Sequence, residues 1–351
     1  MSTRYGSWIY IFCFSLVSGF AQAPASLPPA STDRHMTLDV VVTDKSGKPV
    51  SGLEQRDFTL LDNKQPQKIV SFQASGSATA DPVEVILLVD TVNTEFTNVA
   101  IERKEIEKFL LRNGGALAQP VSMIFFSDTT ATGTTASRDG NAVIADMNQK
   151  QLGLRTIGRS QGFTGGLERA QLSLNTLQKL ADFEATLPGR KLVVWISPGW
   201  PFLVSGLDRE LTSQRQRQMF FSSIVALSDG LRRARITLFN IDPLGTADAG
   251  DLRTTDYKQF LKPVKKADQA DNGDLALQVL ATQSGGRVLN SSNDLAGEIA
   301  TCVADANAFY ALSFEGLAGD GPNEYHALEI KMGKPGLTAR TRSGYYAQPG
   351  H

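Results

Sequence analysis

Runs of consecutive apolar residues, rather than alternating ones, dominate the middle of the chain. Val83 to Val89 is almost uninterrupted and is followed by Asp90, which is typical of a strand buried on both faces of a sheet. Similar runs recur further along, and stretches with apolar residues at helical spacing separate them, most clearly at 166–187. Strands that alternate with helices predict an α/β domain with a doubly wound, mainly parallel sheet. We expect its further strands at 121–126, 192–197, 236–241 and, more weakly, 287–289.

The sequence also predicts the structure of two of the stretches between these strands. Residues 98–112 predict a helix whose apolar side consists of Ile101, Ile106, Phe109 and Leu110. The polar stretch 245–274 has no such periodicity, and we expect it to be an exposed excursion from the domain.

The two ends of the chain have a different pattern, with short strand-like segments separated by turn residues. Three are expected before the α/β domain and three after it, and neither set is large enough for a core of its own. We therefore predict one small β-sandwich formed by both terminal segments, with the α/β domain inserted between them. The expected segments are 36–76 and 305–348 for the sandwich and 82–304 for the α/β domain, with strands at 37–43, 58–61, 69–72, 309–314, 325–331 and 337–341.

The first residues predict export. Arg4 precedes the apolar run Trp8–Phe20, and Ala21-Gln22-Ala23 offers a small-x-small cleavage site. This order is typical of a secretory signal peptide at 1–23, and an uncleaved N-terminal anchor is the alternative. Residues 24–35 are rich in Pro and Ser and predict a linker. No later run reaches the roughly 18 apolar residues of a spanning helix, so we expect a mature protein without a membrane span, periplasmic or extracellular.

Composition, charge and motifs argue against nucleic-acid binding, zinc binding and catalysis. The 351 residues are 41% apolar and 20% charged, with a formal net charge of −1, and this balance argues against a nucleic-acid partner. The histidines, His35, His326 and His351, are scattered and suggest neither a catalytic set nor a zinc site. No phosphate-binding glycine loop follows a predicted strand. We expect a protein that is not an enzyme.

Several blocks of the sequence, taken in order, carry a family resemblance. They read VTDKSGKPVSGLEQRDFTLLDNKQPQKIVSF, VILLVDTVNT, LPGRKLVVWISPG, LATQSGGRVL and EYHALEIKMGKPGLTARTRSGYYA. Together they resemble the von Willebrand factor A-related proteins abundant in acidobacteria. The resemblance implies an exported protein with an A-type domain, in which a metal-ion-dependent adhesion site holds Mg²⁺ at the carboxyl end of the sheet. The expected ligands are an Asp-x-Ser-x-Ser loop, a Thr from a second loop and an Asp from a third.

The resemblance carries over to this site only in part. Asp90 and Thr94 match the first and last positions of the first loop, Val92 replaces the middle serine, and Thr164 matches the second-loop threonine. No aspartate follows the strand at 192–197 where the third ligand is expected. Asp90, Thr94 and Thr164 therefore predict a degenerate site that binds Mg²⁺ weakly or not at all. The alternative is that Asp90 caps the following helix or accepts hydrogen bonds from loop amides.

The same loops predict a contact surface. Asn93 lies in the first loop, and Trp200 and Phe202 follow the strand at 192–197. The two aromatic residues either anchor a partner, since aromatic side chains carry much interface energy, or pack over the end of the sheet. The leading hypothesis is an extracytoplasmic protein-binding or adhesion module whose protein partner the sequence does not identify. The alternative is a structural envelope component with a vestigial A-type scaffold.

Overall fold

The computed structural model describes residues 34–77, 81–149, 162–203, 213–243 and 256–350. The expected signal peptide, 1–23, and nearly all of the expected linker, 24–35, lie outside these ranges. Within them, no helix combines the length and the apolar character that crossing a membrane requires.

A seven-stranded sheet forms the centre of the molecule, with strands in the order β11-β10-β9-β5-β6-β7 and β8 paired to β6. The five strands from β11 to β6 run parallel, and the short strands β7 and β8 run antiparallel to β6. This arrangement confirms the predicted α/β domain with a mainly parallel sheet. The strands are β5 (Val83–Asp90), β6 (Ala116–Phe126), β7 (Ala131–Gly133), β8 (Ser137–Asp139), β9 (Arg190–Ile196), β10 (Ile236–Ile241) and β11 (Val288–Leu289).

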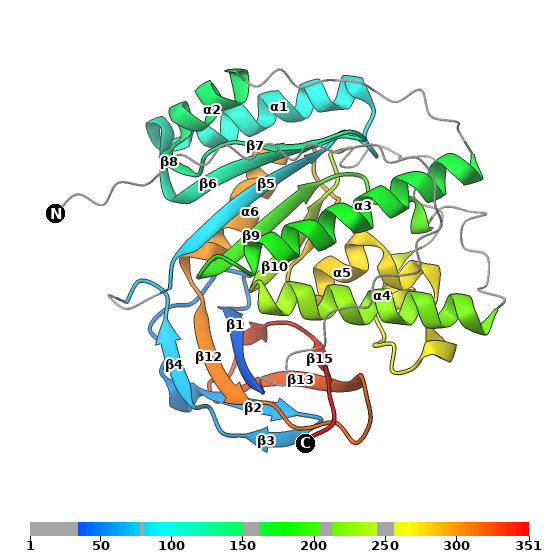
Figure 1. Cartoon of the computed structure of the whole chain (residues 1–351). Coiled ribbons are helices and arrows are strands. Elements are labelled where there is room, and N and C mark those ends of the chain that lie inside the picture. The colour runs from blue at the N-terminus through cyan, green and yellow to red at the C-terminus, as the bar shows by residue number, and fades with distance from the viewer. Residues whose placement is uncertain (1–33, 78–80, 150–161, 204–212, 244–255, 351) are drawn as a thin grey trace.

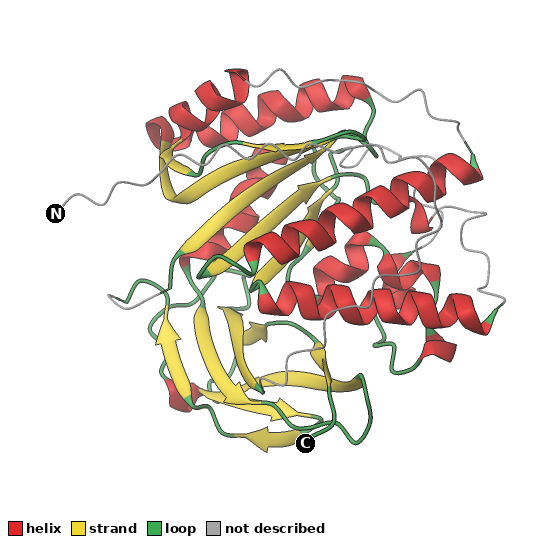
Figure 2. Cartoon of the chain, in the orientation of Figure 1, coloured by secondary structure: helices red, strands yellow, loops and turns green. Residues whose placement is uncertain are grey.

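Helices cover both faces of this sheet (Figures 1 and 2). One apolar cluster joins the sheet to the first group of helices and a second cluster joins it to the other group, so the domain has three layers. The first group is α1 (Phe96–Leu110), α2 (Gly140–Gln149) and α6 (Leu295–Asn307), and the second is α3 (Phe163–Glu184), α4 (Gln214–Arg233) and α5 (Leu277–Gln283).

The apolar side predicted for α1 is confirmed for Ile106, Phe109 and Leu110, which are buried, but Ile101 does not lie on it. Ile101 is 61% exposed, whereas Glu102 is only 1% exposed. The buried face is set by Val99, Ile106 and Phe109, which lie in the apolar cluster with α6. Because Glu102 lies three residues after Val99 and four before Ile106, the helix that buries these two residues also buries the glutamate.

The described part of the polar stretch 245–274 is not an exposed excursion. From residue 256 onward it forms three short 3-10 helices, and Val264 and Ala270 belong to the apolar cluster of α3 and α4. Gly273 packs so closely against the ring of Phe260 that a Cβ there would lie 2.4 Å from the ring. Residues 245–255 lie outside the described residues. The 3-10 helices are η5 (Tyr257–Phe260), η6 (Ala267–Gln269) and η7 (Asn272–Leu275).

Two four-stranded antiparallel sheets lie beside the central domain, in the lower part of Figure 1. Their orders are β14-β1-β12-β4 and β15-β13-β2-β3, so each sheet takes strands from both terminal segments. Apolar side chains from both sheets share one buried cluster. Short strands β3 and β15 were not predicted. The strands are β1 (His35–Thr43), β2 (Phe58–Asp62), β3 (Gln65–Gln67), β4 (Ser71–Ala74), β12 (Tyr310–Glu315), β13 (Glu324–Met332), β14 (Thr338–Arg340) and β15 (Gly344–Ala347).

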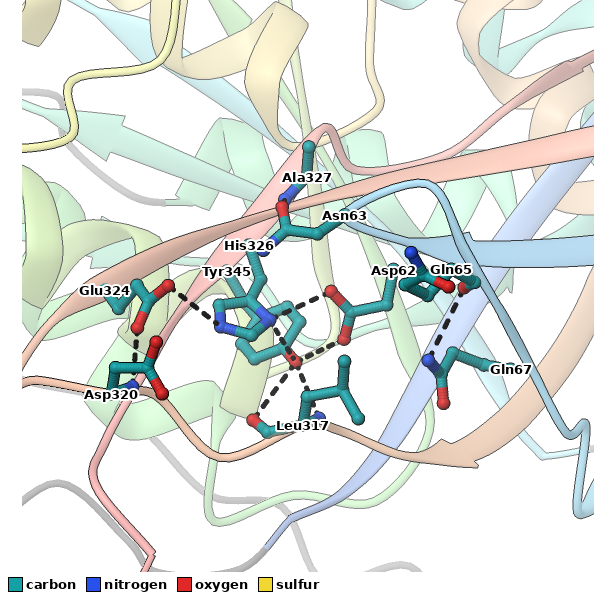
Figure 3. Close-up of polar contacts among 10 residues, drawn as sticks. All are labelled: Asp62, Asn63, Gln65, Gln67, Leu317, Asp320, Glu324, His326, Ala327 and Tyr345. Atoms are coloured by element: carbon teal, nitrogen blue, oxygen red, sulfur yellow. Dashed lines mark hydrogen bonds and ion pairs between the residues drawn. The ribbon is translucent and has the colours of Figure 1, made fainter.

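A buried polar cluster ties three strands of the second sheet together (Figure 3). His326 Nδ1 lies 2.9 Å from Asp62 Oδ1, and the Tyr345 hydroxyl donates to Asp62 Oδ2 at 2.6 Å. The same hydroxyl accepts a hydrogen bond from the Leu317 amide at 3.0 Å. Burial, followed by the neighbouring Asp62, raises the pKa of Tyr345, so its hydroxyl stays protonated as the donor. His326 therefore has a structural partner in this sheet.

Buried ion pairs join the terminal sheets to the central domain. Asp305 of α6 is fully buried and pairs with Arg287 at 3.1 Å and with Arg340 of β14. Arg235, the residue before β10, donates to Asp39 of β1 at 2.6 Å. Since Arg235 precedes a parallel strand, this contact lies at the amino end of the central sheet. The loops that follow the parallel strands lie at the opposite, carboxyl end of the sheet.

Candidate functional site

The first loop at the carboxyl end of the sheet is organised by Asp90, the last residue of β5. Its Oδ1 accepts hydrogen bonds from the backbone amides of Val92 and Asn93, each at 2.9 Å. Its Oδ2 accepts from Asn93 Nδ2 at 2.8 Å and from Trp195 Nε1 of β9 at 2.9 Å. Four donors thus fill the roughly four acceptor positions of one carboxylate. Asp90 is fully buried, and the four donors around it are uncharged N–H groups of the protein.

The pKa of Asp90 reflects two opposing effects. Burial is the largest of them, and it raises the pKa above the ordinary value for aspartate. The hydrogen bonds from Asn93, Trp195 and Val92 act in the opposite direction because they stabilise the ionised form. The four donors therefore keep this buried site compatible with a carboxylate.

The two threonines of the predicted metal set lie in different environments. Thr94 is buried, and its hydroxyl has no hydrogen-bond partner among the described residues. Thr164 is the second residue of α3 and is exposed. The link between the first loop and α3 instead uses Asn93, whose Nδ2 donates to Ser173 Oγ at 2.9 Å. Asn93 thus connects the loop to α3 from within the protein.

The third loop begins at Ser197 and holds no carboxylate in its described part. The Gly199 amide donates to Ser197 Oγ at 3.2 Å, and Gln278 Nε2 donates to the Pro198 carbonyl at 3.2 Å. Asn240 of β10 fixes the start of the loop, because its Nδ2 donates to the Ser197 carbonyl at 2.8 Å. Asp208, the next aspartate along the chain, lies outside the described residues.

These contacts test how well the predicted set fits Mg²⁺. A cation on Asp90 would have to displace at least one of the four N–H donors that point at its oxygens. The geometry thus favours the second reading of Asp90, in which the carboxylate accepts hydrogen bonds from the loop, and Asp90, Thr94 and Thr164 do not fit Mg²⁺ in this arrangement.

Trp200 and Phe202 are both buried, at 2% and 6% exposure. The Trp200 ring packs edge-on against Trp195 with centroids 5.1 Å apart, and both aromatic residues belong to the apolar cluster beneath α3 and α4. Of the two readings that the sequence left open, the structure favours packing over the end of the sheet. Neither side chain offers an exposed anchor to a partner.

Sequence reasoning missed two residues that shape this site. Trp195 lies within an apolar run, so nothing in the sequence distinguished its indole N–H as the partner of Asp90. Glu102 carried a detectable signal, because its spacing from Val99 and Ile106 places it on the face that they bury. The prediction placed Ile101 on the buried face of the helix, and Glu102 was therefore not recognised as a buried residue.

Comparisons with known proteins add little. No family model matches the chain, and no curated protein sequence matches it. Solved structures with some similarity include an aerotolerance-related membrane protein from Bacteroides fragilis, at 13% identity and a TM-score of 0.33, with 64% of this chain and 98% of that chain covered. The manganese-loaded TRAP protein of Plasmodium vivax gives 12% identity, a TM-score of 0.35, and 82% and 98% coverage.

A third similar structure is the pilus adhesin SpaC from Lactobacillus rhamnosus GG, at 10% identity and a TM-score of 0.37. The similarity covers 88% of this chain and 49% of that chain, so the chain spans about half of the adhesin. At such TM-scores these similarities carry no argument about partners or activity. The functional case has to be made from the residues of this chain.

Proposed function

We propose that this protein is an extracytoplasmic protein-binding or adhesion module that uses the loops at the carboxyl end of its central sheet. Open α/β sheets place their ligand sites at this end, because the loops after parallel strands meet there. The terminal sheets are attached at the amino end, through Arg235 and Asp39. The proposal includes no catalytic step.

The observation that carries the proposal is the set of four donors on Asp90. Through Asn93 the carboxylate connects the first loop to α3, and through Trp195 it connects the loop to β9. The loop is thereby held in one conformation by the protein itself. We infer a site of the von Willebrand A type in which internal hydrogen bonds have taken the place of the cation, so that binding does not require Mg²⁺.

The N-terminal segment and the terminal sheets also fit this role, the first as an export signal and the second as a support for the central domain. The signal-peptide pattern at 1–23 predicts export to the periplasm or the cell exterior. We propose that the two antiparallel terminal sheets pack as one β-sandwich, since they share a single apolar cluster. That unit would hold the central domain from the amino end of its strands.

The test is capture of a partner from the native envelope fraction by the mature protein, with Mg²⁺ and with EDTA. We expect capture to survive EDTA. Thr164→Arg places a bulky charge on the exposed first turn of α3 and should weaken capture about tenfold or more. Thr186→Arg is the matched control, because this exposed residue follows the opposite end of α3. Equal capture by both variants, or loss of capture in EDTA, would contradict the proposal.

The second candidate function is a structural envelope component with a vestigial A-type scaffold. Burial of Trp200 and Phe202 favours it, because these two predicted anchors are packed inside the protein, whereas the aromatic anchors of binding surfaces are exposed before the partner binds. Cross-linking of the captured partner distinguishes the two functions. Cross-links to the strands of the terminal sheets would support the structural role, and cross-links near Thr164 would support the recognition role.

A further inference from the structure

An acidic side chain lies in the core beside the first loop. Glu102 of α1 is 1% exposed, and it occupies the same helix face as Val99 and Ile106, which pack against α6 and the sheet. Neither carboxyl oxygen has a hydrogen-bond partner among the described residues. A buried carboxylate without donors is strongly disfavoured, so this group needs a proton or a change of structure.

The charges around Glu102 make ionisation harder. Asp90 at the end of β5 and Asp242 after β10 both act on it, and both are acidic. On α6, Glu298 is also buried and has one carboxyl oxygen without a hydrogen-bond partner in the described structure. Burial, with Asp242 and Asp294, raises the pKa of Glu298 to about 7. Asp242 thus acts on both buried acids, Glu102 of α1 and Glu298 of α6.

Two of the three cationic side chains of α1, Arg103 and Lys108, have partners elsewhere, and the third, Lys104, is exposed. Arg103 donates to Asn148 of α2 and lies 3.7 Å from Glu107, and Lys108 pairs with Glu105 and with Asp294 of α6. On α2, Asp146 accepts from the Thr135 amide. Burial, then Asp90 and Asp242, raise the pKa of Glu102 well above its ordinary value. The burial of the carboxyl group, its lack of donors within the described residues and the direction of this shift all favour its protonated form.

We propose that Glu102 is a proton-dependent switch for the carboxyl end of the sheet. While Glu102 holds its proton, the first turns of α1 stay packed against the sheet and α6. When it loses that proton as the pH rises, the new charge faces Asp90 and Asp242, and the first turns of α1 move out toward water. The effect reaches the candidate site because α1 begins at Phe96, directly after the loop that Asp90 organises.

The sign of the effect follows from proton linkage. A carboxyl whose pKa is higher in the folded than in the unfolded protein stabilises the fold fully below its unfolded pKa, and that contribution is lost as the pH rises through the folded pKa. Packing of α1 should therefore weaken as the pH rises. The inference concerns the structure of α1 alone, so it can fail or hold independently of the proposed protein binding.

Amide hydrogen exchange tests the switch, with rates corrected for the intrinsic effect of pH. Between about pH 6 and about pH 10, protection of residues 96–104 should fall about tenfold or more in the natural protein. Glu102→Gln is neutral at every pH and should abolish that change. Glu107→Gln, at a half-buried position of the same helix, should behave like the natural protein. Constant protection in the natural protein, or an unchanged fall in Glu102→Gln, would overturn the proposal.

Two further measurements guard against a variant that does not fold. Glu102→Met replaces the carboxyl with an apolar side chain of similar length, and it should also show no pH-dependent loss of protection. In the natural protein, the carboxyl carbon of Glu102 can be followed by NMR through the titration. A titration midpoint in the ordinary glutamate range, at about 4.3, would also overturn the proposal.

Discussion

At the scale of single residues, hydrogen-bond donors rather than residue type decide what a buried acid does. Asp90 and Glu102 lie at the same end of the sheet, and both are buried. Asp90 has four N–H donors, whereas Glu102 has none among the described residues. Asp90 is therefore suited to remain a carboxylate that shapes a loop, and Glu102 is suited to bind a proton.

Replacing Asp90 should be costly even if no cation ever binds. Asp90→Ala leaves the Val92 and Asn93 amides, the Asn93 side chain and the Trp195 indole without their acceptor. Each buried donor left unpaired costs about 1–3 kcal/mol, so we expect a loss of at least about 3 kcal/mol in the free energy of unfolding. Urea unfolding with and without Mg²⁺ measures it.

The matched control for this change is Asp182→Ala, which removes an exposed aspartate from α3. It should change the stability by less than about 0.5 kcal/mol. A loss in Asp90→Ala that appears only when Mg²⁺ is present would show that the cation, rather than the hydrogen bonds, is what Asp90 holds.

At the scale of helices and strands, the predicted runs were most reliable where every residue is buried. All seven residues of β9 are buried, so its sequence is continuously apolar apart from Arg190 and Lys191. The three-residue strands β3, β7 and β8 have no such signal, because a partner strand rather than apolar spacing specifies them. The resemblance of residues 90–94 to an adhesion loop could be found in the sequence, but the donors on Asp90 come partly from β9, and only the folded chain brings them together.

The second terminal sheet provides a test of one such tertiary contact. In Tyr345→Phe, the Leu317 amide loses its acceptor and Asp62 loses a donor, while the ring volume is kept. We expect a loss of about 1–3 kcal/mol in the free energy of unfolding, measured by urea denaturation. Tyr325→Phe removes a hydroxyl that, within the described ranges, makes one hydrogen bond, to Ser343 Oγ at a long 3.3 Å, and should have a much smaller effect. Equal losses in the two variants would contradict the role given to Tyr345.

At the scale of the whole molecule, the ion pairs at Asp305 make the terminal sheets and the central domain one unit. Asp305 pairs with Arg287 and with Arg340 of β14, and its carbonyl accepts from Arg190 Nη1 at 2.8 Å. Arg190 is fully buried, and burial lowers its pKa to about 10. The junction is therefore a desolvated polar network. Removing the Asp305 side chain would leave Arg287 and Arg340 without this acceptor.

Asp305→Ala should accordingly loosen the whole protein. Removing one partner of a buried pair costs about 3–5 kcal/mol, and we expect calorimetry to show an earlier and broader transition, with the terminal sheets melting apart from the central domain. Asp268→Ala breaks an exposed pair with Lys266 and should shift stability by less than about 1 kcal/mol. A single sharp transition in Asp305→Ala at the original temperature would show that the junction does not couple the two parts.

The pairing of β1 with β12 also sets the order in which the protein can mature. His35 lies opposite Glu315, 280 positions later, so β1 has no neighbour on that side until the residues near 315 have been synthesised. Closing so long a loop is slow. During that interval the first strands expose unpaired edges to proteases and to other nascent copies, which makes them natural clients for a holding chaperone.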